Sequence, residues 1–168
     1  MTNFLLETER LWIHPVQIED APFVLELLNS AGWVKYIGER NVRTIEEAEN
    51  YIRNRFLKHF EAFGFGVYSV KLRDNQESIG ICTLLKKPYL DKPDIGYAFL
   101  EKFSGKGYAF EATKAVYDYA KSPLNIVEIL AVTTLDNERS IKLLNKLGFH
   151  FDKNIFVENE EVKLFTNK

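Results

Sequence analysis

The stretch Asp94–Ala112, DIGYAFLEKFSGKGYAFEA, decides how the rest of the chain is interpreted. It begins with a β-prone run over residues 94–100 and then turns sharply at Gly105 and Gly107. Beyond the turn, residues 108–121 carry apolar side chains at helical spacing. The stretch therefore predicts a strand, a glycine turn and a helix in direct succession.

This glycine turn predicts an anion-binding loop. Glycines let a backbone pass close to a ligand, and the start of the following helix presents unpaired N–H groups with partial positive charge. The turn is not a nucleotide P-loop, because Gly107 and Tyr108 follow Lys106 where Ser or Thr would be needed. It is not a dinucleotide fingerprint either, since the next small residue of that pattern, Ala112, comes five residues after Gly107. Taken alone, the pattern leaves a phosphate site and a simple tight turn as alternatives.

Upstream of this stretch, the chain alternates between strand and helix patterns. A short strand over residues 11–14 ends at Pro15, and apolar residues at helical spacing follow over 23–28. Thr44–Glu47 has the spacing of a capping box, which predicts a helix from about residue 45 to 62.

Strands predominate in the remaining segments. The alternation in residues 65–72 and 78–85 predicts an antiparallel hairpin. Residues 127–133 are apolar enough for a strand buried on both faces, and they lead into a short helix ending at Gly148. Residues 149–156 and 162–165 are predicted as a closing pair of strands. The order of elements indicates an α/β fold with a mixed sheet, built as one domain over residues 1–168.

Composition excludes several classes of protein. The net charge of −2 argues against general nucleic-acid binding. A lone Cys82 cannot form an internal disulfide, so a reducing cytoplasm is the expected location. We expect no signal peptide and no membrane span, because the N-terminus lacks a basic segment followed by an apolar one and no apolar run approaches a membrane-spanning length. The histidines at 14, 59 and 150 are scattered, and no metal site is predicted.

Two ordered signatures carry a resemblance to a known family. Residues 104–112, following the strand, resemble the acyl-CoA pyrophosphate loop of the GNAT acetyltransferases, with Gly107 and Ala109 matching its consensus and Ser104 replacing its usual Gln or Arg. Residues 137–140, with Lys146–Phe149 behind them, are similar to the second signature of that family. The resemblance spans essentially the whole chain.

A narrower resemblance is to the branch containing the ribosomal-protein N-terminal alanine and serine acetyltransferases. It rests on Thr8–Leu11, Pro15, Asp20–Ala21 and residues 44–48. What the family implies is a central sheet, mixed but mostly antiparallel, with helices on its faces.

The resemblance also implies acetyl-CoA as cosubstrate. Its pantetheine arm would lie against the strand at Phe99 and Leu100, and Asn137 would lie close to the cofactor. Its pyrophosphate would rest on the glycine turn and the helix start, that is on Gly105, Lys106, Gly107, Tyr108, Ala109 and Phe110.

Acyl transfer to an amine requires a neutral nucleophile, so a general base is useful. Glu101, just beyond the strand, corresponds to the glutamate assigned this role in the ribosomal-protein branch. The leaving thiolate benefits from a proton donor, but Leu144 occupies the position of the family's common tyrosine. Ser140 is the nearby substitute that the resemblance suggests. An exposed loop glutamate and a helix-capping serine are the alternative interpretations.

The sequence identifies fewer residues for binding the acceptor amine than for binding the cofactor. Trp33 and Tyr36, in the glycine-containing segment between the first two predicted helices, are predicted to line the acceptor site. The expected activity is direct transfer of acetyl to a primary amine, on a protein N-terminus or a small molecule, by a monomer or homodimer. A non-catalytic acyl-CoA-binding or sensing module is the alternative, and a nucleotide-dependent kinase or ligase is disfavoured because the Walker pattern is absent.

Overall fold

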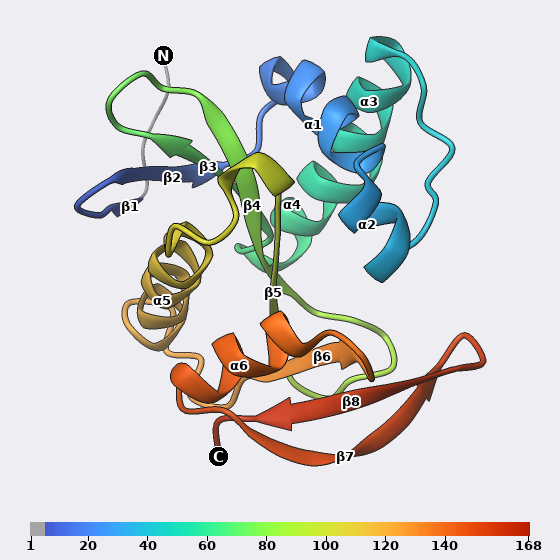
Figure 1. The fold of residues 1–168 in the computed structure, drawn as a ribbon, viewed down its shortest axis with the longest axis vertical. Coiled ribbons are helices and arrows are strands. Elements are labelled where there is room, and N and C mark those ends of the chain that lie inside the picture. Colours follow the sequence, from blue (N-terminus) through green and yellow to red (C-terminus); the bar gives the residue numbers. More distant parts are fainter. Residues whose placement is uncertain (1–5) are drawn as a thin grey trace.

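A computed structural model describes residues 6–168 and contains one continuous eight-stranded sheet (Figure 1). The strand order across the sheet is β1-β2-β3-β4-β5-β6-β8-β7. The strands are β1 (Leu6–Glu7), β2 (Leu11–Pro15), β3 (Val67–Leu72), β4 (Ser78–Leu85), β5 (Asp94–Phe99), β6 (Leu130–Thr134), β7 (His150–Val157) and β8 (Glu160–Thr166). The order confirms the α/β fold with a mixed sheet.

The direction of strand pairing changes at the centre of the sheet. Among the described residues, β5 and β6 form the one parallel pair, and every other neighbouring pair is antiparallel. The parallel pair has a single register partner, Asp94 with Leu130, after which the two strands diverge. Asp94 is buried at 4% exposure there and pairs with Lys87 at 3.0 Å. The two halves of the sheet therefore meet at one end only, and a seam opens between them.

Helices cover both faces of the sheet (Figure 1). They are α1 (Ala21–Leu28), α2 (Ala31–Tyr36), α3 (Ile45–Tyr51), α4 (Lys58–Phe63), α5 (Tyr108–Lys121) and α6 (Glu138–Lys146). One buried cluster joins α1 and α3 to the sheet through side chains such as Leu27, Ala48 and Ile81. A second cluster joins α5 and α6 to the other face through Val116, Leu144 and their neighbours.

The second predicted helix is confirmed in position and in its starting signal. Thr44 Oγ1 accepts from the N–H of Glu47 at 3.1 Å, and the Glu47 carboxylate accepts from the N–H of Thr44 at 3.2 Å, which completes the capping box. From there the chain remains helical to Phe63, but residues Ile52–Leu57 form a π-helical segment between α3 and α4.

Two local expectations were wrong. The strand predicted from residue 127 begins at Leu130, because Asn167 side-chain atoms bind the N–H of Ile129 at 2.9 Å and the C=O of Val127 at 2.9 Å in place of a neighbouring strand. The segment between the first two predicted helices contains a further helix, α2, whose Ser30 Oγ accepts from the N–H of Trp33 at 3.4 Å.

Candidate functional site

The open seam leaves backbone groups of β5 available. Leu100 donates its N–H toward β4, whereas Leu130 of β6 donates to the C=O of Pro93 at 2.9 Å. Because backbone groups alternate in direction along a strand, the N–H and C=O groups of Tyr97 and Phe99 face the seam. Beyond Asp94, β6 supplies no register partner to them among the described residues. This edge of β5 can accept an extended ligand as an added strand.

Of the two residues predicted to contact the pantetheine arm, only Phe99 presents its backbone groups to the seam. The N–H of Leu100 donates to the C=O of Ile79 at 3.0 Å, and its C=O accepts from the N–H of Phe103 at 3.0 Å. Its side chain is 5% exposed and belongs to the core beneath α1 and α3. Sequence reasoning missed Tyr97 because an aromatic residue in a strand is more often part of the core.

The glycine turn has the conformation that glycine permits and other residues resist. Gly105 and Gly107 have φ angles of +76° and +81°. Gly107 is the N-cap residue of α5, and no side chain caps that helix. The first N–H groups of an α-helix lack intrahelical acceptors, so those at the start of α5 point outward with the positive end of the helix dipole. A Cβ at Gly105 would meet no atom within 4 Å, so the space above the turn is open.

A network that the sequence did not reveal anchors this turn to the first strands. Arg10 Nε lies 2.7 Å from Glu111 Oε2 in the first turn of α5, and Arg10 Nη1 donates to the C=O of Lys106 at 2.9 Å. Thr8 Oγ1 donates to Glu111 Oε1 at 2.6 Å. The Arg10 guanidinium also stacks 4.4 Å from the centre of the Tyr108 ring. No local spacing reports a contact between residues about 100 positions apart, although residues 8–11 belonged to the family resemblance.

A cleft of about 490 Å³ lies beside the glycine turn. It is lined by Glu101, Ser104, Gly105, Arg139 and Lys142. The two cations come from α6, facing the open helix start of α5. They make the cleft suitable for a diphosphate, whereas Lys106, the cation predicted from the sequence, is not among the residues that line it. The Lys106 Nζ lies 5.9 Å from the centre of the Phe103 ring.

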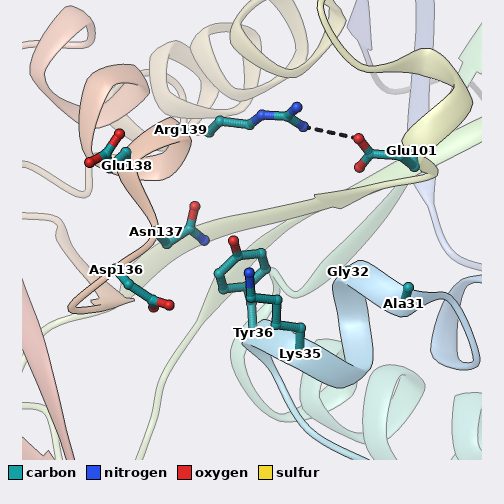
Figure 2. Close-up of a pocket in the computed structure, with 9 residues that line it drawn as sticks. All are labelled: Ala31, Gly32, Lys35, Tyr36, Glu101, Asp136, Asn137, Glu138 and Arg139. Atoms are coloured by element: carbon teal, nitrogen blue, oxygen red, sulfur yellow. Dashed lines mark hydrogen bonds and ion pairs between the residues drawn. The ribbon is translucent and has the colours of Figure 1, made fainter.

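A second cavity, of about 450 Å³, adjoins the first (Figure 2). Its lining comes from α2, the end of β5 and the turn into α6: Ala31, Gly32, Lys35, Tyr36, Glu101, Asp136, Asn137, Glu138 and Arg139. Three carboxylates and two cations therefore surround it. The hydrogen bond between Lys35 and the Tyr36 hydroxyl raises the pKa of Lys35, so its ammonium stays charged.

The structure separates the two predicted acceptor residues. Tyr36 lines the cavity together with Asn137 (Figure 2). Trp33 is 7% exposed and packs in the core with α1 and α3. The two side chains lie three residues apart on a short helix, but Trp33 faces the core.

Glu101 and Arg139 stand at the boundary between the two spaces, because each lines both of them. Arg139 Nη1 donates to Glu101 Oε1 at 3.3 Å, as the dashed line in Figure 2 marks. Both side chains are largely exposed, at 74% and 77%. Glu101 begins a short 3-10 turn directly after β5, which places its carboxylate at the open end of the seam.

Ser140 lies at the start of α6, and its hydroxyl is free of the capping role. Asn137 is the N-cap residue, and its Oδ1 accepts from the backbone N–H of Ser140 at 3.2 Å. The Ser140 hydroxyl instead lies beside the Tyr97 hydroxyl. Burial raises the pKa of Tyr97, and the Ser140 hydroxyl, acting as a donor toward the phenol oxygen, partly offsets that rise. Leu144 is 3% exposed in the core, so its position offers no group to the seam.

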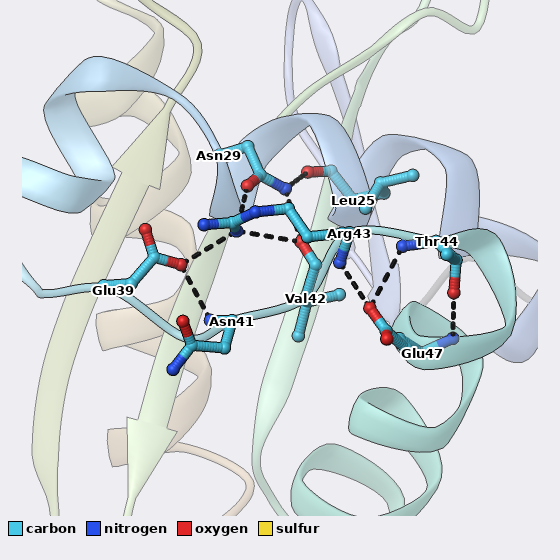
Figure 3. A network of polar contacts seen from close by, with 8 residues as sticks. All are labelled: Leu25, Asn29, Glu39, Asn41, Val42, Arg43, Thr44 and Glu47. Carbon is cyan, nitrogen blue, oxygen red and sulfur yellow. Dashed lines mark hydrogen bonds and ion pairs between the residues drawn. The ribbon is translucent and has the colours of Figure 1, made fainter.

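A polar network fixes the loop between α2 and α3 (Figure 3). Arg43 Nη1 donates to Asn29 Oδ1 at 2.6 Å and to Glu39 Oε1 at 2.8 Å. The Asn29 amide donates to the C=O of Val42 at 2.8 Å. The hydrogen bond from Arg43 lowers the pKa of Glu39 to about 2. This network holds the chain that follows Tyr36 against the end of α1.

Two further searches cover residues 6–168. No three His, Cys, Asp or Glu side chains in this range are grouped so that they could hold a metal ion. None of the helices over the same residues combines the length and the apolar character needed to cross a membrane.

Comparison with known proteins matches this chain to acetyltransferases. Residues 10–150 match the family described as Acetyltransferase (GNAT) domain. The uncharacterized N-acetyltransferase YoaA of Bacillus subtilis is 30% identical over 86% of this chain and 82% of its own length. The [ribosomal protein uS5]-alanine N-acetyltransferase of Escherichia coli is 34% identical over 57% of this chain and 49% of its own length.

More distant similarity supports the same fold. The spermidine N(1)-acetyltransferase of Escherichia coli is 23% identical over 87% of this chain and 76% of its own length. The solved structure of a GNAT-family acetyltransferase from Bacillus anthracis superposes with a TM-score of 0.79 at 23% identity, covering 96% of each chain.

Proposed function

The chain belongs to the GNAT acetyltransferase family, and from that premise we propose that it transfers acetyl from acetyl-CoA to a primary amine bound between α2 and the turn into α6. The observation that carries the proposal is the open seam. It joins a free edge of β5, an uncapped helix start and two adjoining cavities. Each of these features matches one part of the reaction.

The residues present fit acetyl-CoA along its length. The pantetheine amides can pair with the free backbone groups of Phe99 and Tyr97. The diphosphate fits the open space at Gly105, where backbone N–H groups of residues 107–110 and the cations Arg139 and Lys142 can hold it. The bound acetyl thioester would then lie beside the boundary of the two cavities.

Glu101 is the proposed general base. It lines the acceptor cavity and also reaches the end of the seam, so its carboxylate can take a proton from an ammonium there, directly or through one water. The neutral amine attacks the thioester carbonyl carbon, the carbon–sulfur bond breaks, and its electron pair leaves on sulfur. The nitrogen then loses its second proton to water, which leaves the amide and balances the proton that the thiolate takes up. No residue of the chain is acylated in this scheme.

Ser140 is proposed to protonate the leaving thiolate. A serine hydroxyl alone is a poor acid, but the Tyr97 hydroxyl beside it is a second group from which the proton can be replaced once Ser140 has given its own to sulfur. The pair would lie beside the sulfur, because Tyr97 is on the seam edge of β5 and Ser140 is in the first turn of α6.

The acceptor is proposed to be a cationic primary amine, because Glu101, Asp136 and Glu138 outnumber Lys35 and Arg139 around the cavity. Names of relatives include an alanine N-acetyltransferase for a ribosomal protein and a spermidine acetyltransferase. Both acceptor classes fit a cavity of about 450 Å³ that is open to solvent. A reducing compartment such as the cytoplasm suits Cys82, which is a buried free thiol.

The test is acetyl-CoA turnover over a panel of amines, followed as released thiol and as acetylated product by mass spectrometry. The panel contains spermidine and short peptides that begin with alanine or serine. We expect at least one of these amines to raise thiol release well above simple hydrolysis. Tight acetyl-CoA binding with no transfer to any amine would instead support the non-catalytic binding module.

A further inference from the structure

One ion pair separates the cofactor cleft from the acceptor cavity. Arg139 Nη1 lies 3.3 Å from Glu101 Oε1, and these two residues are the lining that the two spaces share. Any diphosphate beside Gly105 is therefore next to Arg139, and any amine in the other cavity is next to Glu101. The pair connects the groups that must act on the two substrates.

The ion pair between Arg139 and Glu101 is weak enough to exchange for a stronger partner. Its side chains are 74% and 77% exposed, and an exposed single-bond ion pair contributes little to stability. A guanidinium has five N–H donors in a planar fork, of which the carboxylate engages one. Phosphate oxygens can offer that fork two parallel bonds and more negative charge than one carboxylate. Arg139 should therefore exchange partners when a diphosphate enters the cleft.

We propose that Arg139 is a positioning residue that couples the two sites: it holds Glu101 when the cleft is empty and releases it to the acceptor cavity when the diphosphate of acetyl-CoA binds. This inference rests on the proposed function, because it needs that diphosphate beside Gly105. The whole Glu101 carboxylate thus becomes available to the acceptor cavity once the acyl donor is bound.

The test is a double-mutant cycle on CoA affinity, measured by calorimetry without any acceptor. Glu101→Gln frees Arg139 from its competitor, and we expect it to tighten CoA binding about two- to fivefold, the range of an exposed ion pair. Arg139→Gln should weaken binding. In the Arg139→Gln background, Glu101→Gln should produce no tightening, whereas in an Arg139→Lys background, which keeps the charge, part of the tightening should return.

Two controls separate this exchange from a general loss of negative charge. Glu138→Gln removes a carboxylate from the same cavity wall, next to Arg139 in the chain but with no ion pair to it among the described contacts, and it should leave CoA affinity unchanged. Pantetheine, which has the thiol arm but no diphosphate, should bind wild type and Glu101→Gln equally when titrated by NMR.

Unchanged CoA affinity in Glu101→Gln would overturn the proposal. So would equal tightening in the presence and absence of Arg139, or equal tightening by Glu138→Gln. The outcome is independent of the proposed activity, because failure of that activity would show as no amine turnover in the wild-type enzyme even when the cycle behaves as expected.

Discussion

The Nε atom of Arg10 lies 2.7 Å from Glu111 Oε2, which links the turn between β1 and β2 to the first turn of α5 across 101 positions of sequence. The same carboxylate accepts from the N–H of Arg10 at 2.9 Å and from Thr8 Oγ1 at 2.6 Å. Since Arg10 also binds the C=O of Lys106, the contact fixes the glycine turn as well as the helix. The conformation of the cofactor cleft therefore depends on the N-terminal strands.

The first prediction concerns Glu111→Gln. Loss of the charge-assisted bonds should lower the free energy of unfolding by about 1–2 kcal/mol at neutral pH and weaken acetyl-CoA binding. Urea unfolding and calorimetry measure the two effects. Lys114→Gln is the matched control, since it removes an exposed ion pair from the same helix, with Asp118, away from the turn. Wild-type acetyl-CoA affinity in Glu111→Gln would show that the turn does not need this anchor.

The pH dependence of this anchor follows from Glu111. Burial alone would raise its pKa, but hydrogen bonds from Thr8 and Arg10 lower it below the ordinary value. A lowered folded-state pKa means that the stabilisation is complete above the unfolded-chain value of about 4.3 and is lost as the pH falls through the folded value. The stability difference between wild type and Glu111→Gln should therefore shrink in acid below about pH 4. A constant difference from pH 7 to pH 3 would contradict this assignment.

The second prediction uses two glycines with the same backbone. Gly105 and Gly64 have φ of +76° and +78°, and a Cβ at either position meets nothing within 4 Å. Alanine should cost each site about 1 kcal/mol of left-handed strain. Only Gly105→Ala should also weaken acetyl-CoA binding, by about tenfold, because its methyl enters the space of the diphosphate. Equal affinities of the two stable variants would place the phosphates elsewhere.

The third prediction concerns the loop network of Arg43. Arg43→Ala removes the bonds to Asn29 and Glu39, so we expect a several-fold higher KM for the amine and an unchanged dissociation constant for acetyl-CoA. Steady-state kinetics and calorimetry separate the two. Arg53→Ala provides a control, because that residue bonds Asn50 at 3.0 Å in the same helical layer. A change in acetyl-CoA affinity alone would mean that the loop serves the cofactor.

The fourth prediction treats the hydroxyls of Ser140 and Tyr97 as one unit. Ser140→Ala and Tyr97→Phe should each lower kcat by about tenfold or more, and the double variant should lose little beyond either single one. The two single variants should melt near the wild-type temperature, because Asn137 and not Ser140 caps α6. Asn137→Ala, in contrast, should lose about 1 kcal/mol of stability. Wild-type kcat in Ser140→Ala would show that solvent protonates the thiolate.

Local chemistry made much of the fold predictable. The capping box at Thr44 and Glu47, the hairpin of β3 and β4 and the glycine turn before α5 each depend on neighbours in the chain, and all are present. The α2 helix was missed because Gly32 lowers helix propensity and tertiary packing of Trp33 outweighs that cost.

The candidate site was predictable only where a signature covers it. Of residues 105–110 and 137–140, Gly105 lines the cleft, Asn137 and Glu138 line the adjoining cavity and Arg139 lines both, and their roles in binding stay predictions. The contacts of Tyr97, Arg139 and Arg10 join elements that are distant in the sequence, so no local pattern predicts them. Burial of Trp33 and Leu100 is likewise decided by which face packs against α1 and α3. The oligomeric state, a monomer or a homodimer, stays a prediction.

In the proposed reaction Glu101 takes the proton of the acceptor amine. The most direct measurement is the pH dependence of kcat/KM for wild type and Glu101→Gln with one amine that the enzyme acetylates. Glu77→Gln serves as control, since it removes a nearby exposed carboxylate that pairs with Lys102 at 3.4 Å. We predict a loss of about 10²- to 10⁴-fold in Glu101→Gln, largest at low pH where little free amine exists, and a wild-type profile for the control. A Glu101→Gln profile that overlays wild type at every pH would contradict the account.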